Sequence, residues 1–364
     1  MIALLSGAKR NVGDHLITEH ALKLLEIHRD EPVKWFANWE SLDDKLDELS
    51  EVRTFVIAGG PGLRSNMYGG VYPLFSSPEL FAELDAKLVF LGSGWKALMG
   101  DAWDIRHELF DATTKKALST LADRVTFSTR DYLSQNMLKN NGLDSVMTGC
   151  PVWYEDSYLG APPQLPSKLR RIVFTEPRRP EMRQQSLLLL KALQGAYPQA
   201  EIVASFHHGF DGIEDYVSTV RAMGVDARDV AADTSKIAFY DDFDLHVGYR
   251  VHAGLYFLSR RKPSLIVSED ARGRGSAEAL GVPWVAARQY CHVGAVVRGS
   301  LPYGRVARMA RRLGPLVEPR RDVSSEVLSI LDHELRGRRW PSYRDIGKTI
   351  DSRYRVMQEF ITSF

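Results

Sequence analysis

Residues 244–255 decide the fold of this chain, and they read Asp244-Leu245-His246-Val247-Gly248-Tyr249-Arg250-Val251-His252-Ala253-Gly254-Leu255. The apolar run has the character of a buried strand that ends at Gly248, and a helical pattern begins at Ala253. Such sheets bind their ligands at the carboxyl ends of the strands. Arg250 and His252 would lie there, where a fixed positive charge beside an imidazole suits an anionic substrate that exchanges a proton.

The same alternation of strands and helices recurs along the whole chain. Most of the apolar runs are continuous, as expected for parallel strands that are covered on both faces. We expect strands at residues 2–5, 33–36, 54–58, 88–91, 124–127, 171–175, 201–205, 245–247, 264–267 and 284–287. Helices such as His15–His28 and Gln185–Ala196 lie between them. This order predicts an α/β protein with two doubly wound, Rossmann-like domains that face a central cleft.

The domain boundary is predicted in a segment rich in glycine and proline. Residues 155–167 contain Gly160-Ala161-Pro162-Pro163 and Pro166 without helical or strand periodicity. We therefore expect an N-terminal domain at 1–155 and a C-terminal domain at 168–335. A helix at 341–364 should follow the Trp340-Pro341 break, because one face collects the apolar side chains of Ile346, Ile350, Tyr354, Met357 and Ile361.

Composition excludes several classes of protein. The chain has 364 residues and a formal net charge of +1, which argues against a general nucleic-acid binder. Two cysteines, Cys150 and Cys291, cannot form a disulfide framework, so we expect a reducing, cytoplasmic location. No apolar run approaches the roughly twenty residues of a membrane span. Because the chain has no CxxC pair and no HExxH motif, we predict no metal site.

The segment after the first strand, residues 7–14, is a further candidate for ligand contact. We expect Asp14 to cap a helix that begins near His15, with Asn11 and backbone N–H groups facing the cleft. A plain helix cap that meets no ligand explains Asp14 equally well.

The turn Ala58-Gly59-Gly60-Pro61-Gly62-Leu63 follows a strand in the same way. Its glycines, Gly59 and Gly60 above all, allow the backbone to approach a ligand closely. The turn lacks the lysine and hydroxyl residue of a Walker loop, and it is not a complete dinucleotide fingerprint. A tight turn without a ligand is therefore an equally strong interpretation.

Arg130 follows the strand 124–127 and is another candidate. Ser128 or Thr129 would begin the next helix, which would place Arg130 near its first turn. There its guanidinium could grip a carboxylate or a phosphate with two hydrogen bonds. A surface arginine paired with Asp131 is an equally strong alternative.

Two more arginines, Arg272 and Arg274, follow the strand 264–267. A second cationic strand end directly after that of Arg250 favours a functional site over a merely buried histidine at position 252.

Two other strand ends carry polar residues to which we assign no role. Arg178 and Arg179 follow the first strand of the second domain, and His207-His208 follows the next. Loop arginines are more often solvated than functional, and two adjacent histidines point in different directions.

An ordered set of motifs resembles the polysaccharide pyruvyl transferase family. The set spans about residues 6 to 285 and comprises Asn11-Val12-Gly13-Asp14, Gly59–Leu63, Ser128–Asp131, Gly149-Cys150-Pro151-Val152, Gly248-Tyr249-Arg250-Val251-His252-Ala253 and Gly281-Val282-Pro283. The Arg-x-His-Ala motif after a glycine is the most diagnostic. The resemblance implies a fold like that of the two-domain glycosyltransferases called GT-B.

The resemblance also implies an activity. Members of the family transfer the pyruvyl group of phosphoenolpyruvate to a sugar as a cyclic ketal, which here would modify a cell-surface glycan or exopolysaccharide and release phosphate. The family's Arg-x-His pair falls on Arg250 and His252, and its histidine is thought to be the general acid. A lysine that the family places after the strand 264–267 is replaced by Arg272 or Arg274, which keeps the charge but does not readily give up a proton.

These expectations define a site and its ligands. Phosphoenolpyruvate is the donor substrate and should bind the C-terminal domain, while a saccharide or lipid-linked glycan acceptor should bind the N-terminal domain. No metal, redox cofactor or nucleic acid is expected. Peripheral association with the inner face of the cell membrane and the oligomeric state stay open. We predict catalytic roles for His252 and Arg250, and substrate binding by Arg130, Arg272, Arg274, Asn11, Asp14, Gly59 and Gly60.

The loops at residues 63–72 and 94–103 are expected to read the acceptor. Their aromatic residues Tyr68, Tyr72, Trp95 and Trp103 could stack on sugar rings, although core packing is at least as strong an explanation.

Two other classes of function fit the same sequence. A nucleotide-sugar glycosyltransferase on this architecture would need an acidic residue for the ribose, and Glu269 or Asp270 could serve. A carbohydrate-binding protein without catalytic activity could also use the fold.

Overall fold

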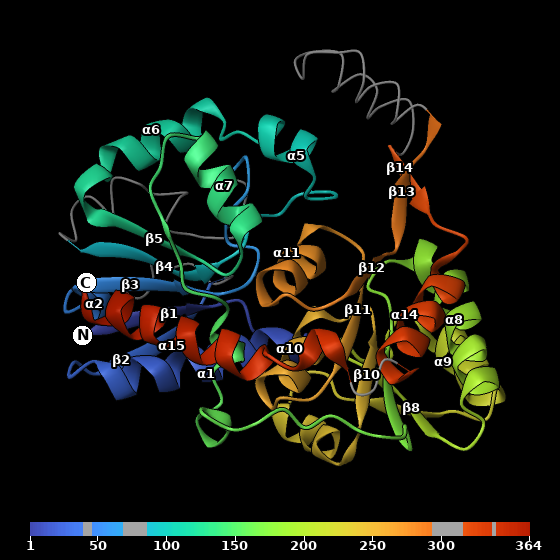
Figure 1. Ribbon diagram of the computed structural model, residues 1–364. Helices are drawn as coiled ribbons and strands as arrows, with labels where there is room; N and C mark the ends of the chain where they lie inside the picture. The colour runs from blue at the N-terminus through green and yellow to red at the C-terminus, as the bar shows by residue number, and fades with distance from the viewer. Residues whose placement is uncertain (39–45, 68–85, 293–315, 337–339) are drawn as a thin grey trace.

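The computed structural model describes residues 1–38, 46–67, 86–292, 316–336 and 340–364 (Figure 1). Two six-stranded parallel sheets, each accompanied by helices, make up the described chain. This arrangement confirms the predicted fold class of two Rossmann-like α/β units.

The first sheet has the strand order β2-β1-β3-β4-β5-β6. Its strands are β1 (Ile2–Ser6), β2 (Val33–Ala37), β3 (Thr54–Ala58), β4 (Lys87–Ser93), β5 (Val125–Thr129) and β6 (Val146–Met147). The helices of this part of the chain are α1 (Val12–His28), α2 (Leu46–Leu49), α5 (Ala102–His107), α6 (Ala112–Thr120) and α7 (Tyr132–Asn140). Every residue of β1 is buried, as its continuous apolar sequence predicts.

The second sheet has the order β12-β11-β10-β7-β8-β9. Its strands are β7 (Arg171–Thr175), β8 (Glu201–Phe206), β9 (Asp226–Asp229), β10 (Leu245–Gly248), β11 (Ser264–Ser268) and β12 (Trp284–Ala286). Helices α8 (Arg183–Ala196), α9 (Glu214–Ala222), α10 (Val251–Ser259), α11 (Ala271–Leu280) and α14 (Val323–Arg336) accompany it. Strands β13 (Arg288–Tyr290) and β14 (Val317–Pro319) form a separate two-stranded antiparallel sheet.

Each sheet has a point at which the direction of winding reverses. In the first sheet β1 lies between β2 and β3, and in the second sheet β7 lies between β8 and β10. Ligands of open α/β sheets bind at such switch points, beyond the carboxyl ends of the strands. In the second sheet Gly248 pairs with Thr175 in register, so the residues that follow β10 and β7 meet at one edge.

All ten predicted strands are present. The described strands that we did not predict are short and lie at sheet edges. β9 reads Asp-Ala-Arg-Asp and β6 has two residues, so neither carries an apolar run that a sequence pattern could detect. The pair β13 and β14 was missed for the same reason, since each strand has three residues.

Three predicted helix starts were wrong. The first helix begins at Val12 with Asn11 as its cap, not near His15 with Asp14 as its cap. The helix after β10 begins at Val251 rather than at Ala253, which puts His252 in its first turn. Ser128 and Thr129 end strand β5 and do not begin a helix.

The C-terminal helix α15 (Ile346–Thr362) is present where the Trp340-Pro341 break predicts it. Of its predicted apolar face, Ile346, Ile350, Met357 and Ile361 are buried. Figure 1 shows α15 (red) running from the side of the second sheet toward the first, so the two chain ends lie near each other. The boundaries that we assigned to the two domains stay a prediction, because residues on both sides of 155–167 share one apolar core with α1, α10 and α15.

Candidate active site

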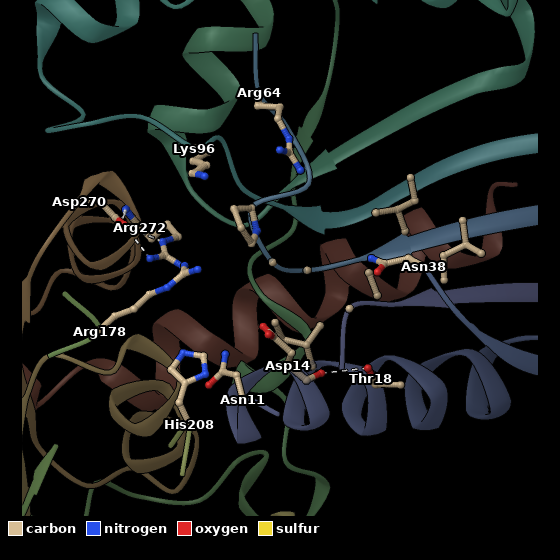
Figure 2. A pocket seen from close by; sticks show the side chains of 18 of the residues that line it. Asn11, Asp14, Thr18, Asn38, Arg64, Lys96, Arg178, His208, Asp270 and Arg272 are labelled. Atoms are coloured by element: carbon tan, nitrogen blue, oxygen red, sulfur yellow. Dashed lines mark hydrogen bonds and ion pairs between the residues drawn. The ribbon is translucent and has the colours of Figure 1, made fainter. Parts of the chain in front are cut away.

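Two neighbouring cavities lie where the carboxyl ends of the two sheets face each other. The outer cavity has a volume of about 470 Å³, and the inner cavity has a volume of about 40 Å³. Both are lined by Asn11, Arg178, His208 and Arg272. Figure 2 shows the outer cavity, with side chains from both halves of the chain turned toward it.

The structure brings most of the predicted site residues together. Arg130, Arg250, His252 and Arg272 all line the inner cavity, as does Asn11. A second group lines the outer cavity, namely Asp14, Gly59 and Gly60 together with Asn11 and Arg272.

Arg274 is the exception among the predicted residues. It lines neither cavity: its Nε donates to Glu278 Oε1 at 2.7 Å, and its guanidinium lies over the ring of Trp284. Arg272 and Arg274 are both on α11, but two residues along a helix point in different directions. Of the two arginines that could replace the family lysine, only Arg272 reaches the cavities.

Arg130 lies at the bend between β5 and α7 and is completely buried. It follows the end of the strand, and Asp131 rather than Ser128 or Thr129 caps α7 by accepting from the N–H of Ser134 at 2.7 Å. Arg130 Nε donates to Asp131 at 3.2 Å, whereas Nη1 and Nη2 have no hydrogen-bond partner among the described residues. Two buried guanidinium nitrogens without acceptors are costly, and an anion in the inner cavity would satisfy them.

Arg250 is held by a buried carboxylate. Its Nε and Nη2 donate to Glu176 Oε1 at 2.9 and 2.5 Å, and its backbone N–H donates to Thr175 Oγ1 at 3.1 Å. Burial raises the pKa of Glu176, and Arg250 opposes that rise. Arg250 is therefore fixed in position, with part of its charge neutralised before any ligand arrives.

His252 lies in the first turn of α10 and is 8% exposed. Its Nε2 atom is buried and has no hydrogen-bond partner in the described structure. Burial, together with the nearby positive charges of Arg130 and Arg272, lowers the pKa of His252 to about 3. The imidazole is therefore neutral at physiological pH while the cavity is empty.

Arg272 and Asp270 form a rigid pair at the start of α11. Asp270 caps the helix, and its two oxygens accept from Arg272 Nε and Nη2 at 2.8 and 2.7 Å. The partner Arg272 holds the pKa of Asp270 at about 2, although burial alone would raise it. Arg272 is thereby positioned at the boundary of both cavities.

Asn11 and Asp14 come from the first turn of α1. Asn11 caps the helix by accepting from the N–H of Gly13 at 3.3 Å. Asp14 lines the outer cavity, and burial raises its pKa, while Asn11, Arg272 and Arg178 oppose the rise. The capping role that we predicted for Asp14 belongs to Asn11, because asparagine is among the strongest capping residues and the helix starts three residues earlier.

Gly59 and Gly60 form the turn after β3, with positive φ angles of 53° and 60°. Such backbone is strained for other residues, and a side chain at Gly59 would collide with Ile17 of α1. The turn brings backbone to the wall of the outer cavity.

Several residues of the site were missed or discounted at the sequence level. Arg178 lines both cavities, although loop arginines are usually solvated. Arg64 and Lys96 line the outer cavity, and neither lies in a recognisable motif. Their positions depend on how loops that follow β3 and β4 fold toward the second sheet, which no local pattern reveals.

Of the four aromatic residues that we considered for sugar stacking, the two that the structure describes line neither cavity. Trp95 is 1% exposed and packs on Phe110, which confirms core packing. Trp103 packs on His107 and lines neither cavity. Tyr68 and Tyr72 lie outside the described residues.

The described residues contain no group of three or more His, Cys, Asp or Glu side chains arranged to hold a metal ion. Helices with the length and hydropathy needed to cross a bilayer are also absent from this part of the chain.

The two facing Rossmann-like units define a GT-B fold, and similarity to solved structures agrees. One similar structure is a UDP-GlcNAc 2-epimerase from Neisseria meningitidis bound to UDP-GlcNAc, with a TM-score of 0.51 and 10% identity over 98% of this chain and 99% of that chain. Another is a UDP-GlcNAc 2-epimerase from Methanocaldococcus jannaschii in complex with UDP-GlcNAc and UDP, with a TM-score of 0.52 and 7% identity over the same shares. At these identities the likeness establishes the fold alone.

The sequence places the chain within this fold. It belongs to the polysaccharide pyruvyl transferase family, whose sequence model matches residues 11–270. This range includes Asn11, the glycine turn, Arg130, the Arg250–His252 pair and Asp270. A search of curated proteins found no match to the chain.

Proposed function

We propose that the protein transfers the pyruvyl group of phosphoenolpyruvate to a glycan, forms a pyruvate ketal and releases phosphate. The observation that carries the proposal is the inner cavity, where two buried nitrogens of Arg130 and Nε2 of His252 lack hydrogen-bond partners within the described structure. An anion that also exchanges a proton would satisfy all three atoms.

Phosphoenolpyruvate fits the charges of this cavity. Its carboxylate and phosphate carry about two to three negative charges at neutral pH. Arg130, Arg250 and Arg272 line the cavity from three different strand ends and would bind these groups. Their guanidinium groups are held by Asp131, Glu176 and Asp270, so binding costs little reorganisation.

His252 would protonate the terminal carbon of the enol, which makes the adjacent carbon electrophilic. The imidazole is neutral in the empty cavity, so the bound substrate must cause His252 to become protonated before it can act as an acid. Its negative charges offset Arg130 and Arg272 and raise the pKa of His252, which lets the ring take up a proton as the donor binds. General acid catalysis of this kind contributes on the order of a hundred- to ten-thousand-fold.

Asp14 would accept a proton from the acceptor. It lines the outer cavity, and its burial makes the carboxylate a better base than a solvated one. The first sugar hydroxyl adds to the electrophilic carbon, the carbon–oxygen bond to phosphate breaks, and the second hydroxyl closes the ring. Of the two hydroxyl protons, one balances the proton gained by the methyl group and the other leaves with phosphate.

The contacts of Glu269 and Asp270 argue against the alternative of a nucleotide-sugar glycosyltransferase, in which one of these carboxylates would bind the ribose. Glu269 accepts from the backbone N–H groups of Arg178 and Arg179 at 3.1 Å each. Asp270 is occupied by the guanidinium of Arg272. Neither is available for a ribose without breaking a buried contact.

The first prediction tests the reaction by phosphate release. The wild-type protein should release phosphate from phosphoenolpyruvate in the presence of candidate glycans, and His252→Ala should reduce the rate at least a hundredfold with donor affinity largely kept. The matched control is His20→Ala, which removes another buried helical histidine that lines neither cavity.

Parallel incubations with nucleotide-sugars separate the alternatives. Nucleotide release without phosphate release would identify a glycosyltransferase, and release of neither would indicate a carbohydrate-binding protein. Undiminished phosphate release by His252→Ala would contradict the assignment of the acid.

A further inference from the structure

The outer cavity contains more positive charge than the donor requires. Five cationic side chains line it against three carboxylates, and the cations are Arg64, Lys96, Arg178, Arg179 and Arg272. Two of the carboxylates are already bound, since Asp270 pairs with Arg272 and Glu181 pairs with Arg288 at 2.6 Å. Asp270 therefore neutralises one cation of the wall, Arg272, whereas the charge of Glu181 is directed to Arg288 outside it.

Three of these cations have no ion-pair partner among the residues that the structure describes. Within the described residues, no hydrogen bond or ion pair engages the side chain of Arg64, Lys96 or Arg178, and Arg64 Nε is buried without an acceptor. Figure 2 shows Arg64 and Lys96 approaching the cavity from the first domain and Arg178 approaching it from the second.

The three side chains act on one another electrostatically. Burial lowers the pKa of Lys96, and Arg64 and Arg178 lower it further. Burial also lowers the pKa of Arg178, with Arg272 and Arg250 adding to the effect. Like charges gathered at the wall of one cavity repel each other until an anion binds between them.

This anion is distinct from the donor in the inner cavity. Of these two cavities, Arg64 and Lys96 line only the outer one, whereas Arg130, Arg250 and His252 line only the inner one. The two groups share Arg178 and Arg272, so the second anion would lie beside the donor and not in its place.

The rest of the outer wall fits a sugar. Thr18, Asn38 and Asp14 offer hydrogen bonds to hydroxyl groups, beside the apolar Leu5 and Ile17. The described residues of this wall include no Phe, Tyr or Trp, so the imidazole of His208 is the only aromatic ring that they offer to a nucleotide base.

We propose that the outer cavity binds the phosphate or diphosphate of a phosphorylated glycan acceptor through Arg64, Lys96 and Arg178. The assignment of this group to the acceptor rests on the proposed function, whereas the existence of a second anion site does not. The enzyme would thus prefer an acceptor that still carries its anomeric phosphate or diphosphate over the same neutral saccharide.

The test is a calorimetric titration with inorganic pyrophosphate. The wild-type protein should bind it, and a saturating concentration of phosphoenolpyruvate should change the affinity by no more than about threefold. Arg64→Gln and Lys96→Gln should each weaken pyrophosphate binding about tenfold, since each removes a charge-assisted hydrogen bond. Both should leave the affinity for phosphoenolpyruvate nearly unchanged.

Lys191→Gln is the control for net charge, because Lys191 is an exposed residue of α8 that lines neither cavity. Displacement of pyrophosphate by phosphoenolpyruvate, or equal affinity in all variants, would overturn the second site. These outcomes are independent of phosphate release, so failure of the site and failure of the proposed reaction are distinguishable.

Three further ligands identify the source of the phosphate. A hexose 1-phosphate should bind more tightly than the methyl hexoside, and Arg64→Gln should remove that preference. UDP should bind no more tightly than pyrophosphate. A hundredfold advantage for UDP would show that the base is read, and would assign the cavity to a nucleotide-sugar instead.

Discussion

At the scale of single residues, the site depends on side chains whose hydrogen bonds are incomplete. Arg130 and His252 are buried with donor or acceptor atoms unsatisfied within the described structure, while Arg250 and Arg272 are fixed by Glu176 and Asp270. The fixed arginines hold positive charge in place. The buried atoms without hydrogen-bond partners are where a ligand would gain the most binding free energy. A neutral buried imidazole among arginines is poised to change its protonation state when an anion arrives.

The second prediction follows from the pKa of His252. The pKa is about 3 in the empty cavity, below the usual value of 6.5, so the ring carries no proton at pH 7. Donor anions raise that pKa. At a pH between the pKa of His252 in the free protein and its pKa in the complex, donor binding should therefore be accompanied by uptake of a proton. The dissociation constant for phosphoenolpyruvate should therefore fall as the pH is lowered through the pKa of the complex.

Calorimetry in buffers of different ionisation enthalpy measures this proton uptake. His252→Gln should bind the donor with a smaller uptake, and the difference between the two proteins isolates His252 from the titration of the phosphate itself. Equal uptake in both proteins would exclude His252 as the group that gains the proton.

At the scale of elements, the site depends on helix starts packed closely together. Gly13 in the first turn of α1 lies against His252 in the first turn of α10, and a Cβ at position 13 would lie 2.6 Å from His252 Nδ1. Val12 also donates its N–H to the carbonyl of His207 at 3.2 Å. The two halves of the chain therefore set the orientation of the imidazole jointly.

The third prediction concerns this contact. Gly13→Ala should force the His252 ring out of position and lower kcat at least tenfold, because displacements of about 1 Å have large catalytic effects. Gly195→Ala is the matched control: it adds a methyl group to helix α8 with nothing within 4 Å. It should leave kcat unchanged and stabilise the fold by about 0.5–1 kcal/mol.

Steady-state kinetics and urea unfolding of both variants check the prediction. An unchanged kcat in Gly13→Ala would mean that the ring can move without consequence.

At the scale of the whole molecule, α15 connects the two halves. Arg29, at the end of α1, donates to the carbonyl of Ile361 at 3.1 Å, and His28 lies 3.1 Å from the hydroxyl of Tyr354. On the other side, the buried Arg261 donates to Asp351 at 2.6 Å. The cavities lie between the two halves, so this helix helps to hold their separation.

The fourth prediction tests this connection. Asp351→Asn should destabilise the fold by about 2 kcal/mol, because it leaves the buried guanidinium of Arg261 without a carboxylate; the partial exposure of Asp351 keeps the loss below that of a fully buried pair. Asp345→Asn breaks an exposed pair with Lys348 and should have no measurable effect.

Denaturant unfolding compares the two variants with the wild type. Equal stability of all three proteins would show that α15 contributes little through this ion pair.

The strands, the fold class and the most informative motif could all be predicted from the amino-acid sequence. Continuous apolar runs such as Ile2–Ser6 and Ser264–Ser268 predict buried parallel strands, because burial on both faces leaves no polar positions. The carboxyl ends of parallel strands share one edge, so the sequence also placed Arg250 and Arg272 near each other. Arg130 follows a strand of the other sheet, and its approach to them depends on how the two sheets face each other.

Which of these residues line the cavities, and which other cations lie beside them, became clear from the three-dimensional arrangement. Local sequence does not distinguish Arg272 from Arg274, because the orientation of each depends on where α11 starts and on what packs against it. Arg64, Lys96 and Arg178 become one cationic wall only when the two sheets face each other. The charge and the burial of such a site are set jointly by residues that lie far apart in the sequence. Both therefore depend on the folded structure and not on the local sequence.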